Sequence, residues 1–127
     1  PLKFHIQFLT DFDFNFNITW EDFIERILKK FRKPELQIGN KTFDKKYLLQ
    51  TNNSELFLKV ITSSVQNVIL TYNIYSLSYQ TNIRKERSEL MSVIQRHAGN
   101  KEMILELIDM FTSIIDTLDR LRVIRKS

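Results

Sequence analysis

The sequence predicts an α+β fold, in which an antiparallel sheet carries helices packed on one face. Apolar and polar residues alternate from position 2 to 18, which is the period of a strand. Three later stretches repeat apolar residues every three or four positions, which is the period of an amphipathic helix. The resulting order, strand or strands, α, ββα, ββα, is typical of α+β domains rather than of parallel sheets.

The first predicted element is extended and covers residues 2–18. Either one long strand or two strands joined near Thr10 would give its alternation, in which the even positions hold Leu2, Phe4, Ile6, Phe8, Thr10, Phe12, Phe14, Phe16 and Ile18. A calcium loop is the alternative, because oxygen-bearing side chains stand at Asp11, Asp13, Asn15 and Asn17. Phe16 occupies the position where such a loop turns sharply, and Asp22 the position of its bidentate Glu. The alternation therefore favours a half-buried strand.

A helix is predicted next, from a Thr19 cap to Lys33. Its apolar stripe runs from Trp20 to Phe31, and Pro34 ends it. Four cations in its last turn suit the helix dipole and also form a candidate anion-binding patch: Lys29, Lys30, Arg32 and Lys33.

The middle of the chain predicts two strand pairs separated by a helix. Residues 36–38 and 43–51 read as a hairpin around the turn GNKT, and a helix capped by Ser54 is predicted to about Tyr72. Asn73 then opens a strand with alternation at 75, 77 and 79, and residues 90–97 are predicted to be extended again. The charged turn between these strands holds the second basic patch: Arg84, Lys85 and Arg87.

The last predicted helix runs from Lys101 to about Arg122, with Asn100 as its cap. Its apolar stripe consists of Ile104, Ile108, Phe111, Ile115 and Leu118, widened by Leu107, Ile114 and Leu121. We expect this broad stripe to pack on the sheet, because a coiled-coil seam would be narrower. The basic tail that follows is expected to fray.

Composition limits the classes of function. The hydrophobic content of 43% over 127 residues fits one domain, residues 1–127, and a start at Pro1 suggests a piece of a longer polypeptide. The net charge of +4 is mild and its charges are interleaved, so a nucleic-acid partner is not favoured. The absence of cysteine excludes disulfides, zinc–thiolate sites and iron–sulfur clusters. The longest uncharged run, residues 60–83, is half Ser, Thr, Asn and Gln and does not fit a membrane span.

Catalytic equipment is sparse in the sequence. His5 and His97 have no second ligand at helical spacing, and two glycines are too few for a phosphate-binding loop. The serines at 63, 64 and 88 stand in no nucleophile-elbow context. We therefore predict no enzymatic activity and no cofactor. A hydrolase would need a deep pocket in which His5 or His97 meets a carboxylate.

Residues 38–57, IGNKTFDKKYLLQTNNSELF, carry a more distinctive pattern. This stretch resembles a motif of uncharacterised bacterial membrane-anchored proteins, G-(N/D)-x-x-F-D-(K/R)-(K/R)-(F/Y), and matches it at Gly39, Phe43, Asp44, Lys45, Lys46 and Tyr47. The resemblance continues more weakly to the helix at 106–118. It implies a soluble domain that follows transmembrane helices, and it transfers no functional residue. Structural roles suffice for the motif: Gly39 in a turn, Phe43 and Tyr47 in packing, and Asp44 against the lysines.

The leading hypothesis is a non-catalytic protein-interaction domain of a bacterial membrane-associated protein. The resemblance places it at the cytoplasmic face of the membrane, and without an anchor it would be cytoplasmic. The alternative is a module that binds nucleic acid or anionic lipid through the two basic patches. The aromatic-rich first strand also predicts a homodimer, because an uncovered edge strand can pair with another chain.

Overall fold

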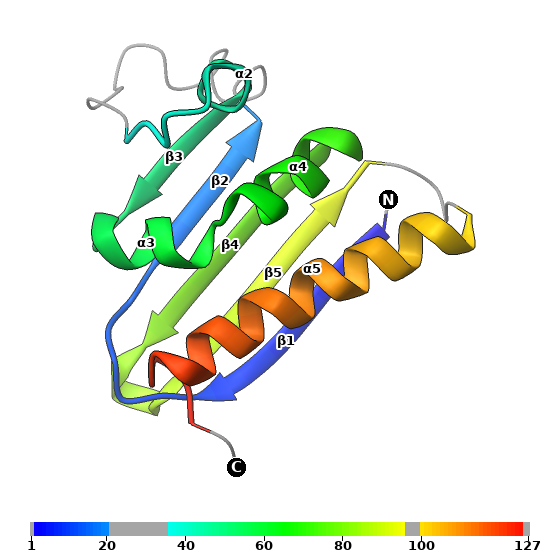
Figure 1. Cartoon of the computed structure of the whole chain (residues 1–127). Coiled ribbons are helices and arrows are strands. Elements are labelled where there is room, and N and C mark those ends of the chain that lie inside the picture. The colour runs from blue at the N-terminus through cyan, green and yellow to red at the C-terminus, as the bar shows by residue number, and fades with distance from the viewer. Residues whose placement is uncertain (1, 21–35, 96–99, 126–127) are drawn as a thin grey trace.

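The computed structural model describes residues 2–20, 36–95 and 100–125. These residues form a five-stranded antiparallel sheet, and helices α3, α4 and α5 lie across one of its faces (Figure 1). The predicted α+β class, with helices on one face, is confirmed. In chain order the elements are β1 (Leu2–Leu9), β2 (Phe16–Trp20), α2 (Lys41–Lys46), β3 (Tyr47–Thr51), α3 (Ser54–Val60), α4 (Ser63–Thr71), β4 (Ile74–Asn82), the 3₁₀ turn η1 (Ile83–Lys85), β5 (Arg87–Ile94) and α5 (Lys101–Arg120).

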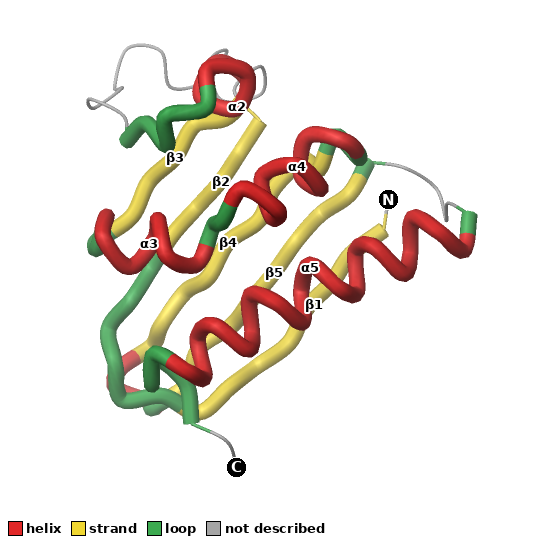
Figure 2. The backbone as a smooth tube through the Cα atoms, viewed as in Figure 1, coloured by secondary structure: helices red, strands yellow, loops and turns green. Residues whose placement is uncertain are grey.

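The alternating N-terminal segment forms two strands that are not neighbours. The strand order is β1-β5-β4-β2-β3, so β1 is an edge strand and β2 lies between β4 and β3. Figure 2 shows the connecting loop passing the ends of β5 and β4. Asn15 fixes this loop, because its side-chain oxygen accepts the Thr81 N–H at 2.8 Å and its backbone carbonyl accepts the Thr51 hydroxyl at 2.8 Å. Of the two predicted arrangements, two strands are observed, but they do not meet near Thr10. Residues 10–15 form a loop, in which Phe14 is fully buried.

The next predicted elements need two corrections. Thr19 and Trp20 belong to β2 and not to a helix, and the rest of that predicted helix, including Lys29, Lys30, Arg32 and Lys33, lies outside the described residues. Residues 36–38 form no strand, and 41–46 form helix α2, so the predicted hairpin is wrong. Asn40 caps α2 by accepting the Phe43 N–H at 3.2 Å, and β3 pairs instead with β2.

The helix predicted from Ser54 to Tyr72 is two helices. Asn53, not Ser54, caps α3 by accepting the Leu56 N–H at 3.0 Å. Thr62 caps α4 by accepting the Val65 N–H at 3.4 Å. The break places Ser63 and Ser64 at the start of α4 rather than in mid-helix, and Val60 and Ile61 beside it are both buried.

The second strand pair and the last helix are confirmed. Strands β4 and β5 pair over eight residues, and β5 runs from Arg87 to Ile94, so it both begins and ends earlier than predicted. Asn100 caps α5 by accepting the Met103 N–H at 2.9 Å. The segment after the helix does not fray up to Arg125, because Val123 and Ile124 are buried. No helix among the described residues has the length and apolarity needed to cross a membrane.

The core lies between the sheet and the helices, and α5 presents a different stripe to it than the sequence predicts. The buried residues of α5 are Met103, Leu107, Met110, Phe111, Ile114, Thr117 and Leu118. Ile104 and Ile108, predicted to be core residues, are 37% and 51% exposed. The predicted stripe therefore follows one flank of the helix, and only part of it reaches the core.

Candidate protein-interaction surface along strand β1

Strand β1 presents two different faces because its side chains alternate. The even positions, from Leu2 to Phe8, point toward the helices and are half-buried, whereas the odd positions are exposed on the open face of the sheet. Phe4 stacks on Phe111 of α5 with ring centroids 3.9 Å apart and an interplanar angle of 8°. This contact shows that α5 packs against the helix-facing side of β1.

The backbone of β1 alternates in the same way. The Thr10 N–H donates to the Glu86 carbonyl at 3.0 Å and continues the β1–β5 ladder, so even-numbered residues direct their backbone groups toward β5. Odd-numbered residues direct theirs away from the sheet. The Leu9 carbonyl accordingly accepts the Arg125 N–H at 2.8 Å, in an antiparallel bridge. Among the described residues this bridge is the one pairing on that side, which leaves the outward groups of Lys3, His5 and Gln7 open to a partner.

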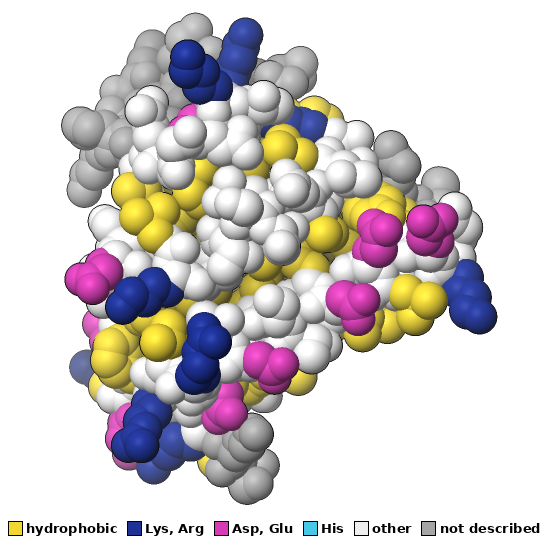
Figure 3. Space-filling model, in the orientation of Figure 1, with side chains coloured by type: hydrophobic (Ala, Val, Ile, Leu, Met, Phe, Trp, Pro, Cys, Tyr) yellow, Lys and Arg dark blue, Asp and Glu magenta, His cyan; other side chains and the backbone are white. Residues whose placement is uncertain are grey.

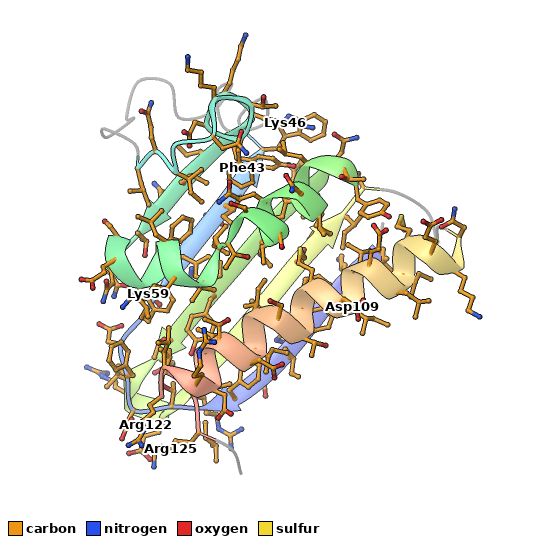
Figure 4. All side chains as sticks on the ribbon, in the orientation of Figure 1. Phe43, Lys46, Lys59, Asp109, Arg122 and Arg125 are labelled. Carbon is orange, nitrogen blue, oxygen red and sulfur yellow. The ribbon has the colours of Figure 1, made fainter. Side chains whose placement is uncertain are left out.

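The apolar face of α5 is broader than the sheet beneath it. Glu106 lies on the flank toward α4, where it accepts the hydroxyl of Tyr72. At about 100° per residue, Ile104, Ile108 and Ile115 lie on the opposite flank, which faces away from α4; Ile104 and Ile108 are exposed there, and Ile115 is partly buried against the core. We call these three residues the α5 overhang. Figure 3 shows hydrophobic surface along this flank beside acidic side chains, and Figure 4 labels one of these, Asp109.

A groove follows the second half of the β1 edge. Its volume is about 420 Å³, and its lining combines β1, the overhang and the chain after α5: Ile6, Gln7, Phe8, Leu9, Arg87, Ile115, Asp116, Asp119, Ile124 and Arg125. Arg125 at its end pairs with Asp11 at 3.4 Å. The groove has apolar and charged walls, and it is suited to one or two side chains of an added segment.

His5 and Gln7 share a carboxylate on the open face of the sheet. Glu89 of β5 lies 3.5 Å from His5 Nε2 and accepts a hydrogen bond from Gln7 Nε2 at 3.0 Å. The His5 and Glu89 side chains are 48% and 42% exposed. A polar hollow nearby is lined by Gln7 and Glu89 but not by His5. His97 lies outside the described residues.

The motif residues 39–47 have structural roles in a turn, in core packing and in hydrogen bonding. Gly39 has φ +90°, which suits its predicted turn, and Phe43 and Tyr47 are fully buried with rings 4.9 Å apart. Burial raises the pKa of the Tyr47 hydroxyl, which donates to the Ile74 carbonyl at 2.6 Å. The prediction for Asp44 was wrong, because its carboxylate accepts the N–H groups of residues 38 and 39 at 2.7 and 3.0 Å. Lys45 is exposed.

Lys46 connects the motif to its neighbours. Its ammonium lies 5.5 Å from the centre of the Trp20 ring and donates to the Asn73 side chain. Asn73 has φ +50°, so this bond helps to hold a left-handed residue at the start of β4. The motif is thus accounted for by packing and capping.

The second basic patch is exposed at the turn between β4 and β5. The structure adds two cations that sequence reasoning missed: Arg122 and Arg125, at the same end of the molecule (Figure 4). This end of the molecule also carries exposed apolar side chains, namely Leu9, Phe12 and Ile83, which are 41%, 40% and 45% exposed. Sequence reasoning missed this cluster because it predicted a frayed tail, and the charges of a frayed segment have no fixed position.

The loop considered as a calcium site is arranged differently from such a site. Asp11 pairs with Arg125, and the Asp13 carboxylate accepts the Asn15 side-chain N–H at 3.1 Å. Within the described ranges, no group of three or more His, Cys, Asp or Glu residues is placed to hold a metal ion. No protein-family model and no curated protein matches the sequence. The proposed function therefore rests on the geometry of the β1 edge.

Proposed function

We propose that this chain is a non-catalytic protein-interaction domain of a membrane-associated protein, and that it binds by adding an extended segment of a partner to the free edge of β1. The observation that supports this proposal is the coincidence of two features. The outward backbone groups of Lys3, His5 and Gln7 lie beside the α5 overhang, which projects past the last strand of the sheet. A strand added at this edge would lie under the overhang.

The two features have different energetic roles. Each new backbone hydrogen bond contributes only about 0.5–1.5 kcal/mol, because the open groups are already hydrated. The overhang supplies the hydrophobic term, at about 0.8 kcal/mol per buried CH₂ group. Ile108 is 51% exposed and Ile104 is 37% exposed, so both have surface left to bury. Hydrogen bonds therefore set direction and register, and the overhang sets affinity.

The proposal is tested with a photo-crosslinking residue at position 7 of the full-length protein in cells. We expect an adduct at position 7 and none at position 50, which is exposed on β3 at the other edge of the sheet. The variant His5→Pro removes one outward N–H without removing a bond to β5, and it should abolish the adduct. His5→Ala keeps that N–H and should retain the adduct. An adduct that survives His5→Pro in a folded protein would refute strand addition.

Membrane association is the part of the proposal that the motif at 39–47 supports. Full-length protein should sediment with membranes and should need detergent for release. Release by high salt alone would indicate a peripheral surface contact, and a fully soluble protein would refute the association.

Binding to an anionic membrane surface is a second candidate function, favoured by the exposed cluster at the β4–β5 turn. Cations and exposed apolar side chains both occur there. The aliphatic side chain of Ile83 suits insertion into a lipid surface better than contact with a nucleic acid, because isoleucine does not stack on bases. Asp11, Asp13 and Glu86 reduce the local positive charge. Sedimentation with vesicles containing phosphatidylserine tests this candidate. Ile83→Ser should weaken sedimentation as Arg84→Gln does, whereas equal binding to neutral vesicles would exclude a role for the cations.

A further inference from the structure

We infer that the partner strand is β1 of a second copy of this chain, paired in antiparallel orientation about a two-fold axis at His5. This inference rests on the proposed function, since it assigns the partner at the same edge. The two copies would form one continuous sheet with both α5 helices on the same face.

The register follows from the direction of the backbone groups. With a two-fold axis perpendicular to the sheet, facing residues must point to the same side, so odd residues pair with odd residues. Odd residues are also the ones whose backbone groups point outward. The Leu9 carbonyl is already occupied by Arg125. The register in which all three open residues pair with one another places Lys3 opposite Gln7 of the second copy and His5 opposite His5.

The apolar side chains agree with this register. On the helix-facing side, Phe4 meets Ile6 of the second copy and Leu2 meets Phe8, so each pair is apolar. Because Phe111 stacks on Phe4, which is next to His5, the middle of α5 lies near the axis. The two α5 helices would then run antiparallel on the two sides of the axis, with Ile108 of one copy near Ile115 of the other. The overhang of each copy is covered by the overhang of its partner.

The charges on the open face agree as well. Lys3 faces Gln7 of the second copy, and in each copy the Gln7 amide is hydrogen-bonded to Glu89 on the next strand. Lys3 and Glu89 of the second copy are therefore two strands apart, about 10 Å between Cα atoms, a span that the two side chains cover together. Within one chain they are remote, because Lys3 faces Val93 and Glu89 lies about 13 Å farther along β5.

A charge exchange tests this arrangement by sedimentation equilibrium of the purified chain. Lys3→Glu and Glu89→Lys should each weaken dimerisation about ten-fold, since each change puts like charges together at two symmetric contacts. The double variant restores both contacts and should return the dissociation constant to within a few-fold of the parent. A purely structural effect of either change predicts no such recovery. Gln50→Lys on β3 adds a charge to the same face and should leave dimerisation unchanged.

A parent chain that stays monomeric up to roughly 1 mM, or a double variant weaker than both single variants, would overturn the inference. Its failure can be separated from failure of the proposed function. An adduct at position 7 that contains another protein and is lost in His5→Pro would keep strand addition and exclude the second copy. If no adduct forms and no dimer forms, both proposals are refuted.

Discussion

Tyr47 illustrates how single residues connect the elements of this fold. It begins β3, its ring packs on Phe43 of α2, and its hydroxyl donates to the Ile74 carbonyl at the start of β4. The Ile69 carbonyl of α4 lies 3.4 Å from the same hydroxyl. One buried side chain thus joins four elements, and its removal tests how tightly they are coupled.

We expect Tyr47→Phe to lower the free energy of unfolding by about 1–2 kcal/mol, because the Ile74 carbonyl is left buried without its donor. The ring remains, so no large cavity forms. Urea denaturation measures the change, with the same m-value used for the parent and the variant. A loss below about 0.3 kcal/mol would mean that water or another group replaces the hydroxyl.

The tyrosine hydroxyls also predict how stability depends on pH. Burial raises the pKa of Tyr47, and burial raises that of Tyr79 against the lowering effect of its hydrogen bonds to Ser88, Thr81 and Thr10. In the unfolded chain both ionise near pH 10, so above that pH the folded state holds more protons. Stability should be fully present below about pH 10 and should fall as the pH rises further. Urea midpoints from about pH 9 to pH 11 measure the decline, which Tyr47→Phe should make shallower.

Prediction from sequence at the residue scale succeeded where a side chain acts locally. Asn100 was identified as a cap because it stands directly before a long periodic helix. Asn40, Asn53 and Thr62 cap helices of only six to nine residues, whose periodicity is too short to reveal them. Asp44 was misassigned because its partners are backbone groups of a turn, which composition does not indicate.

At the scale of elements, period was a good guide to the existence of β1, β4 and α5 and a poor one for residues 41–51. Phe43, Tyr47 and Leu49 alternate as in a strand, but Asn40 caps the first turn and Asp44 ties it to the preceding residues. Residues 41–46 therefore close into helix α2 before the strand starts at Tyr47. Local capping outweighed a short period-two signal.

Helix α5 offers a matched pair of substitutions that separates its core from its overhang. Phe111 is 4% exposed and stacks on Phe4, whereas Ile108 is 51% exposed. We expect Phe111→Ala to cost about 3–5 kcal/mol of stability, and Ile108→Ala to cost less than about 1 kcal/mol, in dilute monomer. Denaturation by guanidinium measures both. A large loss for Ile108→Ala in the monomer would mean that Ile108 contributes to the core and is not free for a partner.

At the scale of the whole molecule, the order of the strands in the sheet could not be predicted from the sequence. Consecutive segments β1 and β2 lie on different sides of β5 and β4, and the hydrogen bonds of Asn15 that hold the connecting loop join residues far apart in the chain. The sequence predicts that the first strand can pair with another chain, and this stays a prediction. It could not show that the overhang projects beyond this strand, because the width of an apolar stripe does not reveal where the sheet beneath it ends.

Amide hydrogen exchange tests the β1 edge within the intact molecule. In dilute monomer the N–H groups of Lys3, His5 and Gln7 point away from β5 and should exchange rapidly, while those of Phe4 and Ile6 are held in the ladder and should exchange slowly. Association at this edge should slow the odd-numbered amides and leave the even-numbered ones unchanged, because only the odd groups gain partners. The comparison uses exchange rates at low and high protein concentration. If both sets slow equally, association stabilises the whole fold from another surface; if the odd amides are already slow in the monomer, the edge is not open.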